Sequence, residues 1–320
     1  MKRFQLLPIV FLLLALSFIY YVVYQQSVLD HQPERKNFML IDNQGNFSPA
    51  LLELLDFLEI DHNNTLKSIV DATQKAWLRQ KGKERWEMEE TFPEKRKELI
   101  NLFHQLGSIK AVKPQKKLYD YVLFFGASFP AFKQRLNFLF KLWNDDIRFN
   151  TIVFLGAQRP LDPQLESPEK MLNTTTNNFP YKKEWELKTE MPQTEIDMMK
   201  LVFDQAKLPQ GFELVNLVFV DTPMQKTDSG QPRRPITVDT INKWLKTYPK
   251  PGSLLVISSQ PHVGYQDTVA RTVLPSHFSI ETVGAAAGPG LKTAVYLDNL
   301  ARWLYQTQEY FKKNKSDCQE

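Results

Sequence analysis

The fold is decided by the stretch Tyr119-Asp120-Tyr121-Val122-Leu123-Phe124-Phe125, a mostly apolar run that is followed by Gly126 and Ala127. Four similar runs follow along the chain, and segments long enough for helices separate them. Short apolar strands that alternate with helices are typical of a parallel sheet with crossover helices. The predicted strands are residues 119–125, 151–155, 214–220, 253–258 and 279–283.

Helices are expected between and after these strands. Five successive strand–helix units predict an α/β domain with a Rossmann-like, doubly wound and mostly parallel five-stranded sheet. A long insertion rich in Pro and Asn, residues 158–192, interrupts the pattern, and loops of this length often cover functional sites. The predicted helices are residues 130–143, 194–206, 238–247, 265–272 and 291–311.

The residues before the first strand have helical periodicity instead. Ser48 and Pro49 suit the N-cap and the first position of a helix, and two further amphipathic helices are expected at 65–80 and 92–106. Lysines around Pro114 predict a solvated linker between these helices and the first strand. A small α-helical region is therefore expected to precede the α/β domain.

The beginning of the chain predicts one N-terminal membrane helix. Lys2 and Arg3 precede residues 6–24, which carry no charge, and at about 1.5 Å per residue this run nearly crosses a hydrocarbon core of roughly 30 Å. One interpretation is an uncleaved single-pass anchor in the inner membrane, with the bulk of the chain in the periplasm. The alternative is a signal peptide cleaved near Ala15-Leu16-Ser17, which leaves a secreted or periplasmic protein.

These patterns divide the chain into four parts. Residues 1–26 are the expected signal anchor or signal peptide, and residues 27–117 are a tether followed by the α-helical region. Residues 118–312 form the expected α/β domain, and residues 313–320 form a polar tail.

Composition argues against several classes of function. The chain has 320 residues, and its 40 Lys and Arg against 36 Asp and Glu leave a net charge of only +4. This balance gives no electrostatic reason to expect nucleic acid as a partner. The single cysteine, Cys318, excludes an internal disulfide, and the five histidines are scattered without the spacing of a zinc site. No metal site is therefore predicted.

Ligands of open α/β sheets bind beyond the carboxyl ends of the strands, near the point where the strand order reverses. Small or polar residues follow every predicted strand at this edge, which predicts a polar site there. Gly126, Ala127 and Ser128 follow the first strand, and Ser259 and His262 follow the fourth.

Sharper nucleotide-binding motifs are absent. The first strand is not followed by G-x-G-x-x-G, and the segment Gly288-Pro289-Gly290-Leu291-Lys292-Thr293 does not have the spacing of a phosphate loop. The backbone N–H groups at the start of the last helix could still hold an anion. No cofactor is identified by these patterns.

Several charged or polar side chains are candidates for chemistry at the rim. His262 could act as an acid, a base or a phosphate donor, or only cap the next helix. Glu195 either favours the dipole of the helix that it opens or faces the rim and pairs with Arg135 or His262. Thr237 and Asp239 begin another helix and are either caps or ligand contacts.

Taken together, these segments resemble the SanA/YdcF/ElyC family, a bacterial group first defined as a domain of unknown function. The resemblance covers about residues 119–304. Ile236-Thr237-Val238-Asp239-Thr240 resembles the family's Asn-Thr-x-Glu-Asn run, and the segment from Leu255 to His262 resembles its strand ending in Thr-Ser-x-x-His. The other carriers are Tyr121-Val122-Leu123-Phe124-Phe125-Gly126-Ala127, Arg135-Leu136 and Thr194-Glu195-Ile196-Asp197-Met198-Met199-Lys200.

The resemblance implies a Rossmann-like domain, often tethered to the inner membrane, with a role in envelope biogenesis or in the barrier against antibiotics. Ligands proposed for the family are nucleotide-like cofactors such as S-adenosylmethionine and lipid-carrier intermediates of peptidoglycan synthesis. This sequence departs from the family where Ile236 and Thr240 replace amides and where Tyr265 replaces an arginine.

Three functions are consistent with these patterns. The first is a membrane-anchored envelope protein that binds a small phosphorylated, nucleotide-like or lipid-linked ligand. The second is a hydrolase of a phosphoester or lipid-linked glycan precursor, with His262 as the acid or base and Glu195 as its orienting carboxylate. The third is a non-catalytic scaffold that binds an envelope partner through its N-terminal helices. The candidate ligand contacts are Gly126, Ala127, Ser128, Arg135, Thr237, Asp239 and Ser259.

Overall fold

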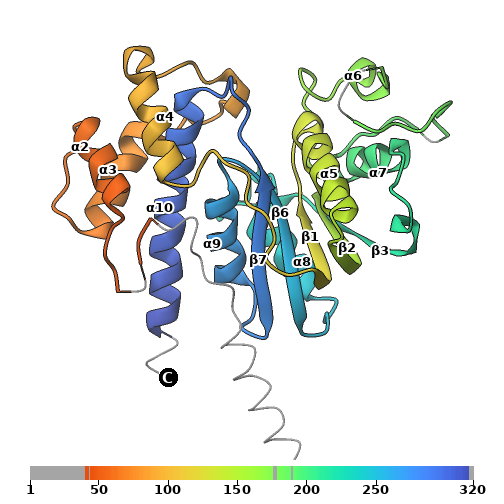
Figure 1. Ribbon diagram of the computed structural model, residues 1–320. Coiled ribbons are helices and arrows are strands. Elements are labelled where there is room, and N and C mark those ends of the chain that lie inside the picture. Colours follow the sequence, from red (N-terminus) through yellow and green to blue (C-terminus); the bar gives the residue numbers. More distant parts are fainter. Residues whose placement is uncertain (1–39, 43, 176–178, 189, 317–320) are drawn as a thin grey trace, which may run out of the picture.

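The computed structural model of the chain describes residues 40–42, 44–175, 179–188 and 190–316. A five-stranded sheet lies at the centre of this part of the chain (Figure 1). Its order is β3-β2-β1-β6-β7, and every neighbouring pair of strands is parallel. The strands are β1 (Leu118–Phe125), β2 (Arg148–Ala157), β3 (Asn216–Thr222), β6 (Gly252–Ser259) and β7 (Phe278–Ala285).

The predicted Rossmann-like α/β domain and its five strands are confirmed. The strand order runs outward from β1 to β3 and then continues on the other side of β1 with β6, so the order reverses between β1 and β6. The third strand starts later than expected because residues Phe212–Leu214 form a short 3-10 helix, η3. The crossover between β1 and β6 is the place where this fold accommodates ligands.

Helices cover both faces of the sheet because the strands are apolar on both sides. Val122 and Phe124 pack toward α5 (Phe129–Asn144) and α7 (Glu195–Gln205). Leu123 and Phe125 point to the opposite face, toward α8 (Thr237–Leu245) and α9 (Val263–Val273). This alternation is the period of two expected of a strand buried on both faces.

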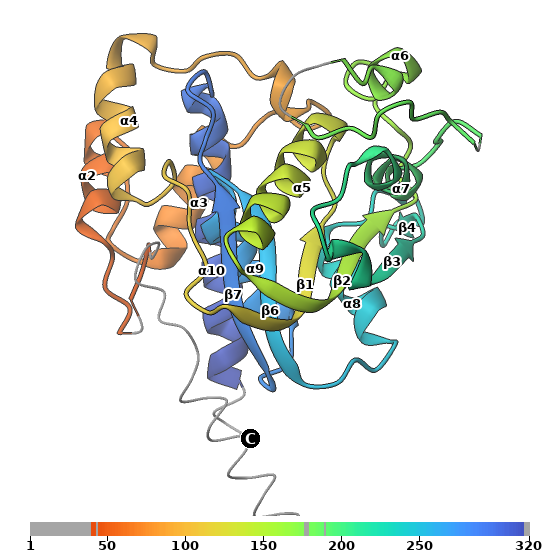
Figure 2. The same ribbon diagram turned by 45° about the vertical axis from the view of Figure 1, so that its right-hand side comes forward.

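The N-terminal helices share a core with the last helix. The helices α2 (Pro49–Phe57), α3 (Leu66–Trp77) and α4 (Arg96–Gln105) pack beside α10 (Thr293–Ser316), as Figure 2 shows. The rings of Phe103 and Tyr296 stack in this core with centroids 4.6 Å apart. The helical region is therefore joined to the α/β domain by a common hydrophobic core.

Two short 3-10 helices connect α3 to α4. They are η1 (Arg85–Glu87) and η2 (Pro93–Lys95). The helix expected at residues 92–106 thus begins as η2, and its preceding residue, Phe92, has a left-handed backbone with φ of +57°. As predicted, Ser48 caps α2 by accepting a hydrogen bond from the N–H of Leu51.

The linker before β1 is not simply solvated as expected. Its Lys110 and Lys113 are exposed, but Val112 forms an antiparallel bridge with Gly284 of β7, and the N–H of Gln115 donates to Glu281. The linker thereby pairs with the outer edge of β7. An unpaired edge is a site for aggregation, so this contact protects the sheet.

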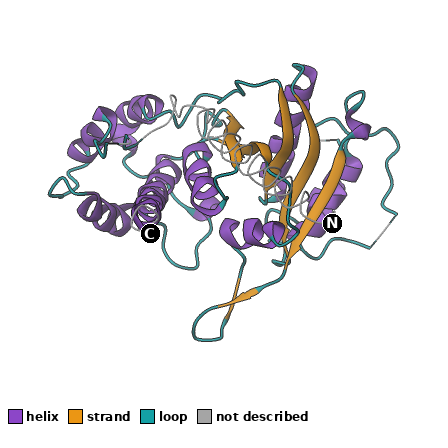
Figure 3. Cartoon of the chain, turned by 90° about the horizontal axis from the view of Figure 1, so that it is seen from below, coloured by secondary structure: helices purple, strands orange, loops and turns teal. Residues whose placement is uncertain are grey.

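The insertion at residues 158–192 folds back on α7. It contains α6 (Pro168–Leu172), and the backbone of Lys182 donates to Gln205 at the end of α7. A separate hairpin, β4 (Gln225–Lys226) and β5 (Pro232–Arg233), extends away from the sheet in Figure 3. The described part of the insertion therefore packs on both α5 and α7, and its residues Arg159 and Glu166 reach the carboxyl end of β1.

The predicted membrane segment, residues 6–24, lies outside the described residues. Within the part that the structure describes, no helix combines the length and apolar character needed to cross a membrane. The predicted polar tail at residues 313–320 begins inside α10, which continues to Ser316.

Candidate functional site

The carboxyl ends of β1 and β6 gather most of the predicted site residues. Gly126, Ala127 and Ser128 connect β1 to α5, and Ser259 is the last residue of β6. His262 directly precedes α9. We use the name switch-point cluster for the charged and polar side chains at this edge: Arg85, Arg135, Ser259, His262 and Asn299.

Arg135 is the central charged group of the switch-point cluster. It projects from α5, and only 4% of its surface is exposed. Its guanidinium donates to the hydroxyl of Ser259 over 3.4 Å and to the carbonyl oxygens of Phe125 and Gly126 over 3.2 and 3.5 Å. Among the described residues, no carboxylate forms an ion pair with it. Burial lowers the pKa of Arg135 to about 10; the charge of Arg85 adds to this effect, and the charge of Glu195 opposes it.

His262 is held by two hydrogen bonds in a single protonation state. Nδ1 lies 2.7 Å from Oδ1 of Asn299, and Nε2 lies 3.0 Å from Nη1 of Arg85. Asn299 donates from its Nδ2 to the carbonyl of Pro261, so its Oδ1 must accept from His262. The imidazole therefore carries its proton on Nδ1 and accepts from Arg85 at Nε2. Burial and the charge of Arg85 hold the pKa of His262 well below 6.5.

Arg85 reaches the cluster from η1 in the helical region. Its Nε lies 3.9 Å from Oδ2 of Asp298, a carboxylate that Arg302 already binds through two hydrogen bonds of 3.0 and 2.9 Å. Burial lowers the pKa of Arg85 to about 10, against the opposing effect of Asp298. The cluster therefore combines two guanidinium groups with a neutral imidazole.

The sequence left open a pairing of Glu195 with Arg135 or His262, and the structure contains neither pairing. Its Oε1 accepts from Nε of Arg159 over 3.1 Å. Burial raises the pKa of Glu195, and the adjacent Arg159 opposes that shift. A Cβ atom at Gly126 would lie 2.8 Å from the same carboxylate oxygen, so the absence of a side chain at Gly126 makes room for Glu195.

Arg159 and Glu166 complete this neighbouring network. Two hydrogen bonds of 2.8 Å join the guanidinium of Arg159 to the carboxylate of Glu166. Oε1 of Glu166 also accepts from the N–H of Phe129 at the start of α5. The network thus places one of the chain's own carboxylates at this helix N-terminus, where an anion is favoured.

Thr237 and Asp239 begin α8, and the described contacts give Asp239 a structural role. Asp239 accepts from the N–H of Ile236 over 2.8 Å and binds Arg233 through both carboxylate oxygens. Burial raises the pKa of Asp239, but these hydrogen bonds outweigh burial and leave it lowered. The carbonyl of Thr237 accepts from Thr240 within the same helix. No described contact joins Thr237 or Asp239 to the switch-point cluster.

The anion expected at the start of the last helix is a side chain of the protein itself. Glu90 accepts from the backbone N–H of Thr293 over 3.1 Å and from its hydroxyl over 2.9 Å. Arg96 pairs with the same carboxylate over 2.6 Å. Burial raises the pKa of Glu90, but these partners outweigh burial and lower it. This helix start is therefore already occupied.

Sequence reasoning gave no role to four residues of the two networks, although it placed Arg159 at the rim. Arg85 lies in a charged segment between two predicted helices, and Glu166 lies in the insertion, so neither has a local signal. Arg159 follows the second strand directly, and that position was a usable signal. Asn299 is polar and lies among the apolar residues of the last helix, and this position was a second usable signal.

No family model and no curated protein matches this sequence. The resemblance to the SanA/YdcF/ElyC family therefore stays a prediction from the sequence motifs. Among the described residues, no group of three His, Cys, Asp or Glu side chains could hold a metal ion.

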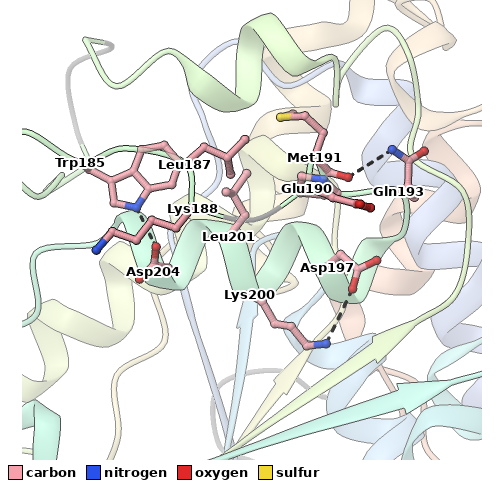
Figure 4. Close-up of a pocket in the computed structure, with 11 residues that line it drawn as sticks. Trp185, Leu187, Lys188, Glu190, Met191, Gln193, Asp197, Lys200, Leu201 and Asp204 are labelled. Atoms are coloured by element: carbon pink, nitrogen blue, oxygen red, sulfur yellow. Dashed lines mark hydrogen bonds and ion pairs between the residues drawn. The ribbon is translucent and has the colours of Figure 1, made fainter.

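A cavity of about 450 Å³ lies between the insertion and α7 (Figure 4). Two of its polar groups are already satisfied by partners that also line it. Nε1 of Trp185 donates to Asp204 over 2.7 Å, and Lys200 pairs with Asp197 over 3.7 Å. None of the switch-point residues lines this cavity. The switch-point cluster and this cavity are therefore separate places on the molecule.

Proposed function

We propose that this chain binds a phosphorylated ligand at the switch-point cluster. The observation that carries the proposal is the guanidinium of Arg135, which is buried and has no carboxylate partner among the described residues. A buried charge is costly unless it is paired. The second guanidinium, that of Arg85, increases this cost because its charge also lowers the pKa of Arg135. A bound anion would relieve both effects.

A phosphate or diphosphate group suits the chemistry of these side chains. Guanidinium groups bind phosphate oxygens through paired, charge-assisted hydrogen bonds. Ser259 adds a hydroxyl next to Arg135. Arg85 also supplies a guanidinium beside His262. This guanidinium could take the place of the arginine that the family has where this chain has Tyr265. The helical region would then complete a phosphate site that the α/β domain holds only in part.

The hydrolase hypothesis has less support from the geometry. Glu195 is bound to Arg159, so it does not orient His262. Asn299 occupies that position instead, and Arg85 covers Nε2. A general base needs an accessible lone pair directed at its substrate. We therefore propose binding, rather than hydrolysis, as the function of the cluster.

The cellular setting belongs to the same proposal. The uncharged run at residues 6–24 would anchor the chain in the inner membrane, with the bulk of the protein in the periplasm. The resemblance to the SanA/YdcF/ElyC family supports a role in envelope biogenesis or barrier function. Nucleotide-like and lipid-linked ligands share a diphosphate group, which is the part that the cluster would recognise.

Calorimetric titration of the full-length protein with inorganic pyrophosphate tests the proposed site. We expect saturable binding that weakens about tenfold or more in Arg135→Gln, because a charge-assisted hydrogen bond is lost. Arg148→Gln is the matched control, since Arg148 lies at the opposite end of the sheet, at the start of β2. Uridine diphosphate and farnesyl diphosphate as further titrants distinguish a nucleotide from a lipid-linked ligand. Equal affinities of wild type and Arg135→Gln would refute the site.

The single cysteine tests the proposed topology. Cys318 is the only cysteine of the chain and lies after α10. A membrane-impermeant maleimide, added to cells whose outer membrane has been permeabilised, should label the wild type and not Cys318→Ser. The labelled protein should sediment with the inner membrane. Labelling that requires disruption of the inner membrane would contradict the predicted orientation.

A further inference from the structure

The end of the sheet opposite the switch-point cluster exposes several apolar side chains. Among the described residues, the three most exposed large hydrophobic side chains are those of Tyr248, Leu214 and Leu118, which are 91%, 84% and 64% exposed. Leu118 is the first residue of β1, Leu214 ends η3 shortly before β3, and Tyr248 lies in the connection from α8 to β6. All three therefore lie at the amino-terminal ends of strands.

The register of the sheet brings these positions close to one level. Leu118 pairs with Arg148, the first residue of β2. The register of β2 with β3, continued by three residues, places position 213 opposite Arg148, and that of β1 with β6 places position 251 opposite Leu118. In Figure 1 this end of the sheet is the lower one, and α10 ends on the same side. The apolar side chains therefore belong to one end of the molecule.

Packing within the fold does not explain the tyrosine at position 248. Its backbone is left-handed, with φ of +53°, a conformation that favours glycine after the end of a helix. The N–H of Tyr248 donates to the carbonyl of Leu245 at the end of α8, and glycine would form the same hydrogen bond. The exposed ring contributes little to the core, so a partner outside the described chain gives a better reason for it.

Basic side chains accompany the exposed apolar ones. We use the name amino-end surface for residues 115–120, 144–148, 206–215, 246–252, 274–277 and 312–314. These segments carry eight Lys and Arg against four Asp and Glu. Residues 40–316 as a whole carry 36 against 32, so their positive surplus is no larger than that of the amino-end surface alone. Six of the eight basic side chains are exposed: Lys117, Lys207, Lys246, Lys250, Lys312 and Lys313.

A lipid surface fits this combination of side chains. Apolar and aromatic groups enter the boundary between headgroups and acyl chains, and lysines attract anionic headgroups. Tyrosine is enriched at this boundary because its ring is apolar and its hydroxyl is polar. Residues 25–39, which join the predicted anchor to Leu40, would span at most about 50 Å when fully extended. The predicted anchor would therefore hold the amino-end surface within reach of the bilayer.

We infer that the amino-end surface rests on a membrane that contains anionic lipids. Tyr248 and Leu214 lie at the boundary of the acyl chains, Lys246 and Lys250 contact the headgroups, and the switch-point cluster faces away from the bilayer. The inference rests on the charges and the exposed apolar side chains of this surface. It does not depend on the phosphate site, and it uses the predicted anchor only to bring the surface near the membrane.

Fluorescence of one label on the full-length protein tests this contact. Thr247→Cys, combined with Cys318→Ser, places an environment-sensitive nitrobenzoxadiazole label next to Tyr248. The protein is reconstituted in vesicles of phosphatidylcholine, alone or with about 30% phosphatidylglycerol, and spin-labelled lipids serve as quenchers. We expect blue-shifted emission and about twofold stronger quenching with phosphatidylglycerol, and sodium chloride should reverse both because salt screens the attraction.

A second label position and two sets of variants provide the controls. Ser229→Cys places the label in the hairpin beyond the carboxyl end of β3, where it should stay in water in both kinds of vesicle. Lys246→Gln with Lys250→Gln should reduce quenching at residue 247 about twofold or more. Lys81→Gln with Lys83→Gln is the matched control, since these exposed lysines precede η1, which reaches the switch-point cluster.

Tyr248→Gly separates membrane contact from folding. Glycine suits the left-handed backbone, so this variant should be at least as stable as the wild type in urea while its label is quenched less. Equal quenching at residue 247 in both kinds of vesicle would refute the inference. So would wild-type quenching in both Tyr248→Gly and the Lys246/Lys250 variant.

The remaining outcomes identify a different partner or a different failure. A blue shift that grows with protein density in phosphatidylcholine vesicles would assign the surface to a second copy of the chain and overturn the inference. Sedimentation with both kinds of vesicle measures the predicted anchor separately, because insertion of an apolar helix does not require charged lipids. The pyrophosphate titration measures the phosphate site, so its failure is distinguishable from failure at the amino-end surface.

Discussion

At the scale of single residues, the surroundings of His262 decide what its imidazole can do. Asn299 and Arg85 occupy its two nitrogens, and burial beside a guanidinium disfavours the charged form. A histidine in this state is a fixed hydrogen-bonding group rather than a titrating base at neutral pH. The free energy of unfolding should therefore depend on pH, because the imidazole of His262 stays neutral in the folded chain and can take up a proton in the unfolded chain.

The pH dependence of stability follows from the lowered pKa of His262. An unfolded histidine takes up a proton near pH 6.5, whereas His262 in the folded protein stays neutral below that pH. The unfolded state therefore binds more protons in this window. The contribution of His262 to stability is complete above pH 6.5 and is lost as the pH falls below it, by at most about 1.4 kcal/mol per pH unit.

Urea denaturation of wild type and His262→Gln between pH 7.5 and 5.5 measures this effect. The wild type should be the more stable protein at pH 7.5, because glutamine replaces the imidazole contacts imperfectly. The difference between the two proteins should then shrink toward pH 5.5. Glu195, whose raised pKa acts with the opposite sign, is present in both and cancels. His104→Gln on the exposed side of α4 is the control, and a constant difference across the pH range would contradict the assignment.

At the scale of secondary-structure elements, a close approach of α9 to α10 joins the sheet to the helical region. A Cβ atom at Gly264 would lie 2.3 Å from the ring of Trp303. Nε1 of Trp303 donates to the hydroxyl of Thr268 on the same side of α9. The helix pair therefore depends on the absence of a side chain at Gly264.

Gly264→Ala should separate these two helices. Overpacking of a core costs about 1–3 kcal/mol. A contact of 2.3 Å to a buried ring belongs at the upper end of this range, above the roughly 1 kcal/mol that alanine adds to helix propensity. We expect a lower midpoint of urea denaturation with an unchanged slope. Gly290→Ala is the matched control because a Cβ there meets no atom within 4 Å. A Gly264→Ala protein as stable as the wild type would show that α9 and α10 do not approach each other this closely at Gly264 and Trp303.

At the scale of the whole molecule, α10 belongs to two parts of the fold. It follows β7 in the α/β domain, and it also supplies one side of the core of the helical region. Leu300 and Leu304 of this helix are fully buried against that region. The same region carries Arg85 into the switch-point cluster. Without the helical region, the apolar face of α10 would be exposed and the switch-point cluster would lack Arg85.

Removal of the helical region should therefore impair the α/β domain. A fragment of residues 118–316 would expose the apolar face of α10, and large exposed apolar patches cause aggregation. We expect this fragment to be insoluble or to bind the dye 8-anilinonaphthalene-1-sulfonate, which reports exposed hydrophobic surface. The full-length protein under the same conditions is the control. A soluble, monomeric fragment with native-like near-ultraviolet circular dichroism would contradict this expectation.

Much of the sheet was predictable because each strand is a local pattern. The runs around Val122, Ile152 and Leu255 are apolar on both faces, and this property is visible without any knowledge of neighbours. The linker at residues 110–117 was predicted less well. Its pairing with β7 depends on backbone hydrogen bonds to residues far along the chain, and such contacts leave no periodic signal.

The sequence by itself determined the class of the fold, the place of the sheet edge and several of its residues, including Arg135, Ser259 and His262. It could do so because each strand is a short apolar run with a local pattern, and because ligands of open α/β sheets bind beyond the carboxyl ends of the strands. Only the tertiary structure decided which charges meet there. Arg85 reaches His262 across 177 positions of sequence, and Glu195 turns to Arg159 instead of His262. Electrostatic partners are chosen by distance in space and by burial, and the packing of the helical region on α10 sets both.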